Sequence, residues 1–266
     1  NVTLSGADYT NAGLSSTVFG NMTNVEKITI GSAHTLTLSS NISATTFDVQ
    51  ADSAQDLILN DGYTNPTTVN IGSDTASADD IHNNANVDLT VTAYNGSITA
   101  ATDIEGSLGK NDVVNLVNFA SGTTVFDPNN DVFETINLVP YTSGAAPSIT
   151  TGAYALGATG GNLTINANTL TALEVVTITG TDSVTPMDIK TGAASDTVTL
   201  GTKADTLDAG AGNDIITGTS GSNVIDAGAG NDTITLGSGV ENISAGAGND
   251  TIVTGSNIAN TDTIDG

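Results

Sequence analysis

The chain has 266 residues, with 29 acidic residues, four lysines, no arginine and no cysteine, and its formal net charge is −25. A surface of this charge repels nucleic acids and anionic membranes but attracts divalent cations. The lack of cysteine excludes disulfides and thiolate metal sites. No apolar run reaches the roughly 18 residues of a membrane span. No signal peptide is visible, so we expect any export or anchoring signal to lie outside this chain.

Residues 1–185 are predicted to form short β-strands. Alternating runs occur at 34–42, 87–94 and 162–168, separated by Gly, Asn, Asp and Ser turns. Helices are disfavoured because β-branched residues, Asn and Asp dominate this part of the chain. The alternation therefore predicts an all-β fold.

A short phrase of the form apolar–Glu–x–aliphatic recurs along the chain. It reads VEKITI at 25–30, FETINL at 133–138, LEVVTI at 173–178 and VENISA at 240–245. Aliphatics two residues apart point to one face of a strand. The reuse of one strand type favours a solenoid over residues 1–185. A sandwich of immunoglobulin-like modules is the alternative, which we favour less because aromatic core residues are scarce.

From residue 191 the chain divides into nonapeptides. The hexapeptide AGAGND occurs at 209–214, 227–232 and 245–250, so that successive copies begin two nonapeptides apart. Position 6 of the nonapeptides is acidic or Asn: Asp196, Asp205, Asp214, Asn223, Asp232, Glu241, Asp250 and Asp262. Position 8 is a large aliphatic: Val198, Leu207, Ile216, Ile225, Ile234, Ile243, Ile252 and Ile264. Each unit is predicted to be a tight Gly turn followed by a short strand whose position-8 side chain points inward.

This pattern resembles the RTX family of calcium-binding repeats, whose GGxGxDxUx nonapeptides form a parallel β-helix. The resemblance covers 191–266, and Ala replaces the first Gly in the three AGAGND units. It implies a β-roll in which two nonapeptides make one coil. Turns separated by two nonapeptides would then lie on the same side. The first row holds the turns at 191, 209, 227 and 245, and the second row holds those at 200, 218, 236 and about 257.

The resemblance also implies Ca²⁺ between successive turns of the first row, bound by position-6 carboxylates and Gly-turn carbonyls. The ligands carried over are Asp214, Asp232 and Asp250, with Gly210, Gly212, Asn213, Gly228, Gly230, Asn231, Gly246, Gly248 and Asn249, and with Asp196 and Asp205 beside them. A metal-free first row is disfavoured because stacked aspartates repel. The second row carries Lys203, Asn223 and Glu241, so its turns are expected to be held by hydrogen bonds and water, with cation binding as the alternative.

Other acidic turns could hold cations, although Asp and Asn turns are usually only turns. The candidates are Asp74 with Asp79 and Asp80, the segment 127–131, and Asp112.

The sequence argues against catalysis, because neither HExxH nor GxSxG is present and no Cys can act as a nucleophile. Composition and repeats together resemble RTX-type bacterial surface-layer proteins. That resemblance implies a secreted, extracellular protein that forms a calcium-dependent two-dimensional homo-oligomeric lattice. Attachment to cell-surface polysaccharide would use a domain outside this chain. We therefore predict a parallel β-solenoid with a β-rich assembly region at 1–185 and a calcium β-roll at 186–266. The alternatives are a stalk or cap of a secreted RTX adhesin, or the RTX portion of a larger secreted enzyme.

Overall fold

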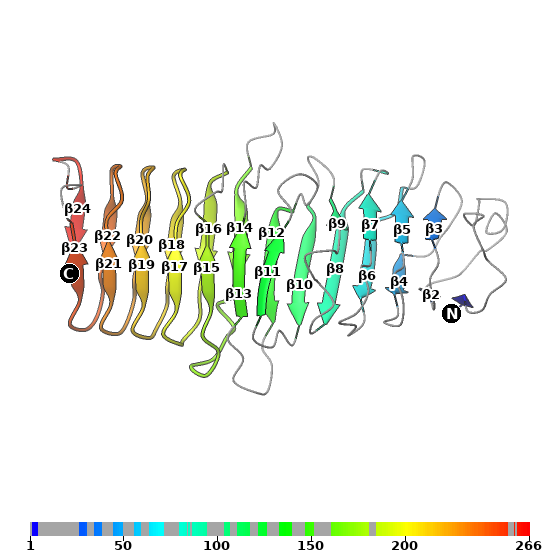
Figure 1. Ribbon diagram of the computed structural model, residues 1–266, viewed down its shortest axis with the longest axis horizontal. Coiled ribbons are helices and arrows are strands. Elements are labelled where there is room, and N and C mark those ends of the chain that lie inside the picture. The colour runs from blue at the N-terminus through cyan, green and yellow to red at the C-terminus, as the bar shows by residue number, and fades with distance from the viewer. Residues whose placement is uncertain are drawn as a thin grey trace. The chain divides into compact units, whose positions relative to one another are not determined.

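The structure is a computed structural model. It describes residues 2–4, 27–30, 35–38, 45–49, 56–59, 64–71, 80–83, 85, 87–94, 104–106, 111–117, 122–126, 133–139, 147–151, 161–180, 185–254, 258 and 260–266. The described residues form parallel β-sheets (Figure 1), and among them no helix is long and apolar enough to cross a membrane. The chain separates into two compact units, one with residues 1–117 and 130–134 and the other with residues 118–129 and 135–266.

The first unit winds as a coil, because from β2 onward its consecutive strands fall alternately into two parallel sheets. One sheet has the order β1-β2-β4-β6-β8-β10 and the other the order β3-β5-β7-β9. The strands are β1 (Val2–Leu4), β2 (Lys27–Ile30), β3 (Thr35–Leu38), β4 (Thr46–Val49), β5 (Asp56–Leu59), β6 (Thr67–Ile71), β7 (Asp80–Asn83), β8 (Leu89–Tyr94), β9 (Ile104–Glu105) and β10 (Val113–Val117). Its core is a ladder in which Phe47 pairs with Val69, and Val91 pairs with both Val69 and Val114. All four are fully buried.

The second unit repeats this plan with two sheets. The odd-strand sheet has the order β11-β13-β15-β17-β19-β21-β23, and the even-strand sheet has the order β12-β14-β16-β18-β20-β22-β24. The odd strands are β11 (Gly122–Phe126), β13 (Pro147–Thr151), β15 (Thr177–Thr179), β17 (Thr197–Thr199), β19 (Ile215–Thr217), β21 (Thr233–Thr235) and β23 (Thr251–Val253). The even strands are β12 (Thr135–Val139), β14 (Leu163–Asn166), β16 (Met187–Lys190), β18 (Thr206–Asp208), β20 (Val224–Asp226), β22 (Asn242–Ser244) and β24 (Thr263–Asp265).

The coils of the second unit become regular where the nonapeptides begin. The step between paired residues is 29 from β12 to β14 and 24 from β14 to β16, and it is 18 at each pairing from β16 through β22. The step from β22 to β24 is 21, which accommodates the three-residue insertion before the last nonapeptide. The predicted coil of two nonapeptides is confirmed, and Figure 1 shows these coils stacked from β17 to β24.

The position-8 aliphatics form the core of the roll. Ile216 pairs with Val198 and Ile234 in the odd-strand sheet, and Ile225 pairs with Leu207 and Ile243 in the even-strand sheet. All six are at most 1% exposed. Burial of each such side chain stabilises the folded chain by about 1.5–3 kcal/mol. In the last strand of each sheet, Ile252 is half-buried and Ile264 is exposed.

The parallel solenoid predicted for the chain is confirmed, and the immunoglobulin-like alternative is wrong. Every pairing between described strands is parallel, whereas immunoglobulin-like sandwiches are antiparallel. The recurring Glu phrases precede or enter solenoid strands, namely β2, β12, β15 and β22. The division of the chain at 185–186 stays a prediction.

Candidate calcium site

The first-row turns stack closely because Gly occupies positions 2 and 4. Gly212 has a φ of +135° and Gly230 a φ of +149°, values that side-chain-bearing residues rarely adopt. A Cβ added at Gly230 would lie 1.5 Å from the carbonyl oxygen of Gly212. The Ala at position 1 is tolerated because the left-handed residues are the second and fourth. Ala209 and Ala227 are instead fully buried in the coil.

Backbone hydrogen bonds hold successive first-row turns together. The N–H of Ala229 donates to the carbonyl of Gly210 at 2.9 Å, and the N–H of Ala247 donates to that of Gly228 at 2.8 Å. Ala229 forms parallel bridges with both Ala211 and Ala247. Turns separated by two nonapeptides therefore lie directly over one another, as the row assignment predicts.

The position-6 aspartates of the first row point into the coil and form a ladder. Asp214 accepts the backbone N–H of Asp196 through Oδ1 at 2.7 Å. Asp232 accepts the N–H of Asp214 at 2.8 Å, and Asp250 accepts that of Asp232 at 2.9 Å. Asp196, Asp214 and Asp232 are each 1% exposed. One carboxylate oxygen per residue is thus used to join a coil to the preceding one.

The other carboxylate oxygen has no partner at two of these residues. Oδ2 of Asp214 and Oδ2 of Asp232 are buried and make no hydrogen bond to the described residues. Desolvation by burial raises the pKa of Asp214 to about 7, with the charges of Asp196 and Asp232 adding to the rise and the N–H of Asp196 opposing it. Burial likewise raises the pKa of Asp232, and the charge of Asp250 adds to this rise. Among the described residues no positive charge offsets these two carboxylates, and an unpartnered buried acceptor costs about 1–3 kcal/mol.

A calcium ion fits these residues. Ca²⁺ takes six to eight oxygen ligands from carboxylates and carbonyls, and the first row offers two carboxylates per pair of turns together with Gly-rich backbone. Within the described part of the chain no group of three Asp, Glu or His side chains is placed to hold one metal ion. The remaining ligands would therefore be backbone carbonyls of the turns. Asp214 with Asp232 and Asp232 with Asp250 would hold the ions, and bound calcium would neutralise these buried carboxylates.

The predicted ligands at the edge of the row have different surroundings. Oδ2 of Asp196 accepts the N–H of Gly192 at 3.2 Å, and Oδ2 of Asp205 accepts that of Gly201 at 2.8 Å. Both carboxylates are therefore hydrogen-bonded through both oxygens, since Oδ1 of each also accepts a backbone N–H. Asp205 belongs to the second row. The roles of Asp196 and Asp205 as ligands stay predictions.

The predicted Asn ligands lie on the outside of the turns. Asn213 accepts the N–H of Asn231 through Oδ1 at 2.7 Å, and Asn231 accepts that of Asn249 at 2.8 Å. All three are exposed. Because the side chains of Asn213 and Asn231 bond the next turn, the predicted contribution of these residues to an ion would come from the backbone carbonyl.

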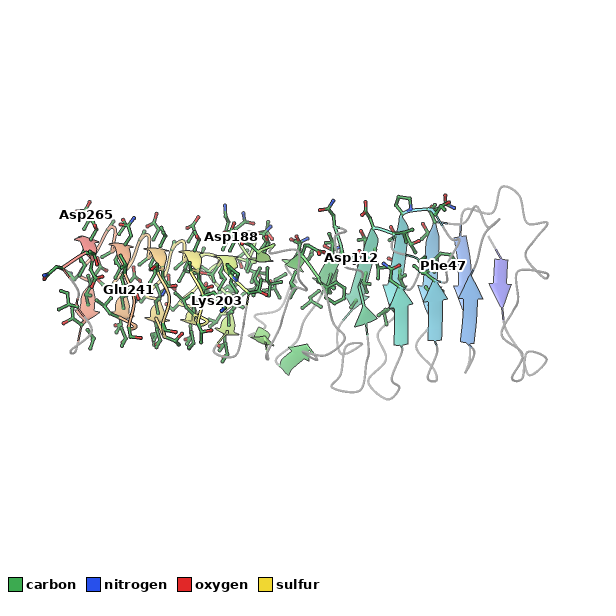
Figure 2. All side chains as sticks on the ribbon, turned by 90° about the horizontal axis from the view of Figure 1, so that it is seen from above. Phe47, Asp112, Asp188, Lys203, Glu241 and Asp265 are labelled. Carbon is green, nitrogen blue, oxygen red and sulfur yellow. The ribbon has the colours of Figure 1, made fainter. Side chains whose placement is uncertain are left out.

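Side-chain hydrogen bonds join the turns of the second row, in addition to backbone bonds such as that from the N–H of Ser238 to the carbonyl of Thr219. Asn223 accepts the N–H of Asp205 through Oδ1 at 3.0 Å and donates through Nδ2 to Oε1 of Glu241 at 3.3 Å. Asp262 accepts the N–H of Glu241 at 3.0 Å. Lys203 is exposed and labelled in Figure 2. This pattern agrees with the hydrogen-bonded interpretation of these turns, with one exception at Glu241.

Glu241 departs from the hydrogen-bonded pattern expected of the second row. It is 1% exposed, and its Oε2 has no hydrogen-bond partner among the described residues. Burial raises its pKa, and the charges of Asp262 and Asp205 add to the rise. The signal was present in VENISA, because the Glu of this phrase falls at position 6 of a nonapeptide.

In the first unit, too, acidic side chains accept a backbone N–H of the preceding coil. Asp112 is fully buried and accepts the N–H of Leu89 through Oδ1 at 2.7 Å. Glu134, from FETINL, accepts the N–H of Asp112 at 2.8 Å. Asp112 therefore joins coils, and its role as a cation ligand stays a prediction. Asp80 lies in β7, while Asp74, Asp79 and the segment 127–131 fall outside the described residues.

Comparisons with known proteins agree with this geometry. Residues 191–225 and 217–252 match the RTX calcium-binding nonapeptide repeat. Searches of the curated proteins and of the solved structures found no match. Residues 191–252 are therefore RTX nonapeptide repeats, which bind Ca²⁺ and form a β-roll within a parallel β-solenoid.

Proposed function

We propose that this chain is a structural protein of a bacterial surface layer, which folds and self-assembles outside the cell when it binds calcium. The observation that carries the proposal is the first-row ladder, in which Asp214 and Asp232 bury carboxylate oxygens with no partner among the described residues. A fold that buries unpaired acids along its length depends on an external cation. A net charge of −25 adds self-repulsion that cations relieve.

The calcium affinity expected of such sites supports a location outside the cell. Calcium modules outside cells bind at about 10⁻⁴–10⁻³ M. A chain with this affinity stays largely unfolded at cytosolic calcium and folds after export. RTX repeat proteins are typically secreted, which supports this location.

The role is structural rather than catalytic. The carboxylates with raised pKa lie in stacked turns that repeat from coil to coil, and most of them accept backbone N–H groups. A repeating ladder serves to join coils, whereas a catalytic site brings different groups to one place.

The proposal is tested by comparing the full chain in excess chelator and across a calcium series. Circular dichroism would follow folding, light scattering would follow association, and negative-stain microscopy would detect sheets. We expect folding first and ordered sheets at higher calcium, because exposed carboxylates between copies are less preorganised than stacked turns. A chain that is fully folded yet monomeric at about tenfold more calcium than folding requires would instead be an adhesin stalk or cap.

A further inference from the structure

The outward face of the odd-strand sheet is a regular array of uncharged side chains. The pairings of β15, β17, β19, β21 and β23 place two ranks in register along the roll. The ranks are Thr177, Thr197, Ile215, Thr233, Thr251 and Thr179, Thr199, Thr217, Thr235, Val253. Neighbouring strands are about 4.8 Å apart, and residues two apart in a strand are separated by about 6.6 Å. The face is therefore periodic both along and across the strands.

The even-strand sheet presents a different outward face. Its outward positions include Asp208, Asp226 and Asp265, all exposed, and Asp188, against a single cation at Lys190. Asp208 pairs directly with Asp226 in neighbouring strands. Figure 2 shows Asp188 and Asp265 along the same side of the coils. Two such acidic faces would repel each other.

We propose that the odd-strand face is where a second copy of this chain packs, sheet against sheet, without a bridging cation. The described odd strands carry no ionisable side chain on this face, so two copies packed here place no like charges opposite one another. Its threonines offer methyl groups and hydroxyls, and Ile215 and Val253 remain 52% and 45% exposed. Flat β-sheets pack face to face through such side chains at about 10 Å. This inference names a contact within the proposed assembly and rests on that function.

The contact is small. Five strands of three residues cover a patch of about 24 Å by 10 Å, well below the roughly 800 Å² per partner of a standard interface. A single contact therefore gives weak association. In a lattice this weak contact would be repeated many times and would act together with calcium bound elsewhere on the chain, so that the association of many copies becomes strong.

Because the chain lacks cysteine, single cysteines can map the contact. Thr233→Cys places a thiol on the odd-strand face, and Asn242→Cys places one at an outward position of the even-strand sheet that is also exposed. The full chain is treated with a short bis-maleimide in saturating calcium, and a monofunctional maleimide measures the reactivity of each thiol. After this correction we expect Thr233→Cys to form dimers about tenfold faster than Asn242→Cys. Equal rates, or a faster Asn242→Cys, would overturn the inference.

A second pair of variants tests the charge argument. Thr233→Asp should reduce calcium-dependent light scattering of the full chain, whereas Asn242→Asp, which adds the same charge on the acidic face, should change it much less. Calcium titration of each variant confirms that folding is retained. If wild-type sheets form and both variants associate equally well, the inference fails and the proposed function stands. If the cysteines trap selectively but no sheets form, the contact stands and the surface-layer function fails.

Discussion

Asp232 is hydrogen-bonded to an aspartate of each neighbouring coil. Its Oδ1 accepts the N–H of Asp214 at 2.8 Å, and its own N–H donates to Oδ1 of Asp250 at 2.9 Å. Its Oδ2 is buried without a partner among the described residues. Asp232 therefore borders both proposed calcium sites, one shared with Asp214 and the other with Asp250.

Asp232→Asn should weaken calcium binding more than any other single first-row change. The amide oxygen can still accept the N–H of Asp214, but the charge at both sites is lost. We expect about a tenfold loss of affinity at two sites, while Asp214→Asn and Asp250→Asn each affect mainly one. Calorimetric titration of the full chain measures affinity and stoichiometry.

The matched control is Asp226→Asn, which removes an exposed carboxylate from the even-strand sheet. Solvent screens this exposed carboxylate, so its charge has little influence on the first-row sites. The calcium affinity of Asp226→Asn should therefore stay within about twofold of wild type. Equal losses for Asp226→Asn and Asp232→Asn would mean that calcium responds to net charge and not to the ladder.

Gly230→Ala should destabilise the roll. The residue has a φ of +149°, and the new Cβ would lie 1.5 Å from the Gly212 carbonyl. Strain and overpacking together predict a loss of about 2 kcal/mol or more, measured by denaturant unfolding in saturating calcium. Gly266→Ala is the control, because its Cβ would meet nothing within 4 Å. Similar unfolding midpoints for the two variants would argue against close stacking of these turns.

Without calcium, the roll should be more stable in mild acid. A raised pKa means that the folded state holds the proton more tightly than the unfolded state. The stability from protonated Asp214 is therefore complete below its ordinary pKa of 3.8 and is lost as the pH rises through about 7. Burial raises the pKa of Asp196 and Asp205 as well. Chelated protein should therefore hold more β-structure by circular dichroism at about pH 5 than at about pH 8.

Asp214→Asn serves as the control for this pH dependence, because its neutral amide does not titrate. The β-structure of its chelated form should change less between the two pH values. A chelated wild-type chain that is equally stable at both pH values would contradict the electrostatic description of the ladder.

The repeats could be predicted from sequence because identity at a fixed interval fixes pairing. The spacing of two nonapeptides places Ile216 beside Ile234, and the structure confirms this pairing. The earlier coils offered no such interval. Ile136 pairs with Ile165, and the next step along the same sheet, from Ile165 to Ile189, has a different length. The solenoid was predictable there, but its register was not.

The site was predicted in part for a related reason. The Asp and Gly residues of the turns predicted calcium binding, and the spacing of two nonapeptides predicted which turns lie on the same side. The sequence did not show that one oxygen of each aspartate joins the preceding coil, because that depends on where the N–H of a residue two nonapeptides earlier points. Asp196 has both oxygens hydrogen-bonded while Asp214 has one without a partner among the described residues, although both sit at position 6.

The most direct test of a calcium-dependent ladder is amide hydrogen exchange of the full chain in excess chelator and in saturating calcium. The N–H groups of Asp214 and Asp232 donate to the ladder, so their exchange reports its formation. A roll saturated at about 100 times its dissociation constant gains about 2.7 kcal/mol per site, which should slow these amides about a hundredfold for each ion bound. We expect the slowing to be centred on residues 209–253. Unchanged exchange there, with or without calcium, would contradict it.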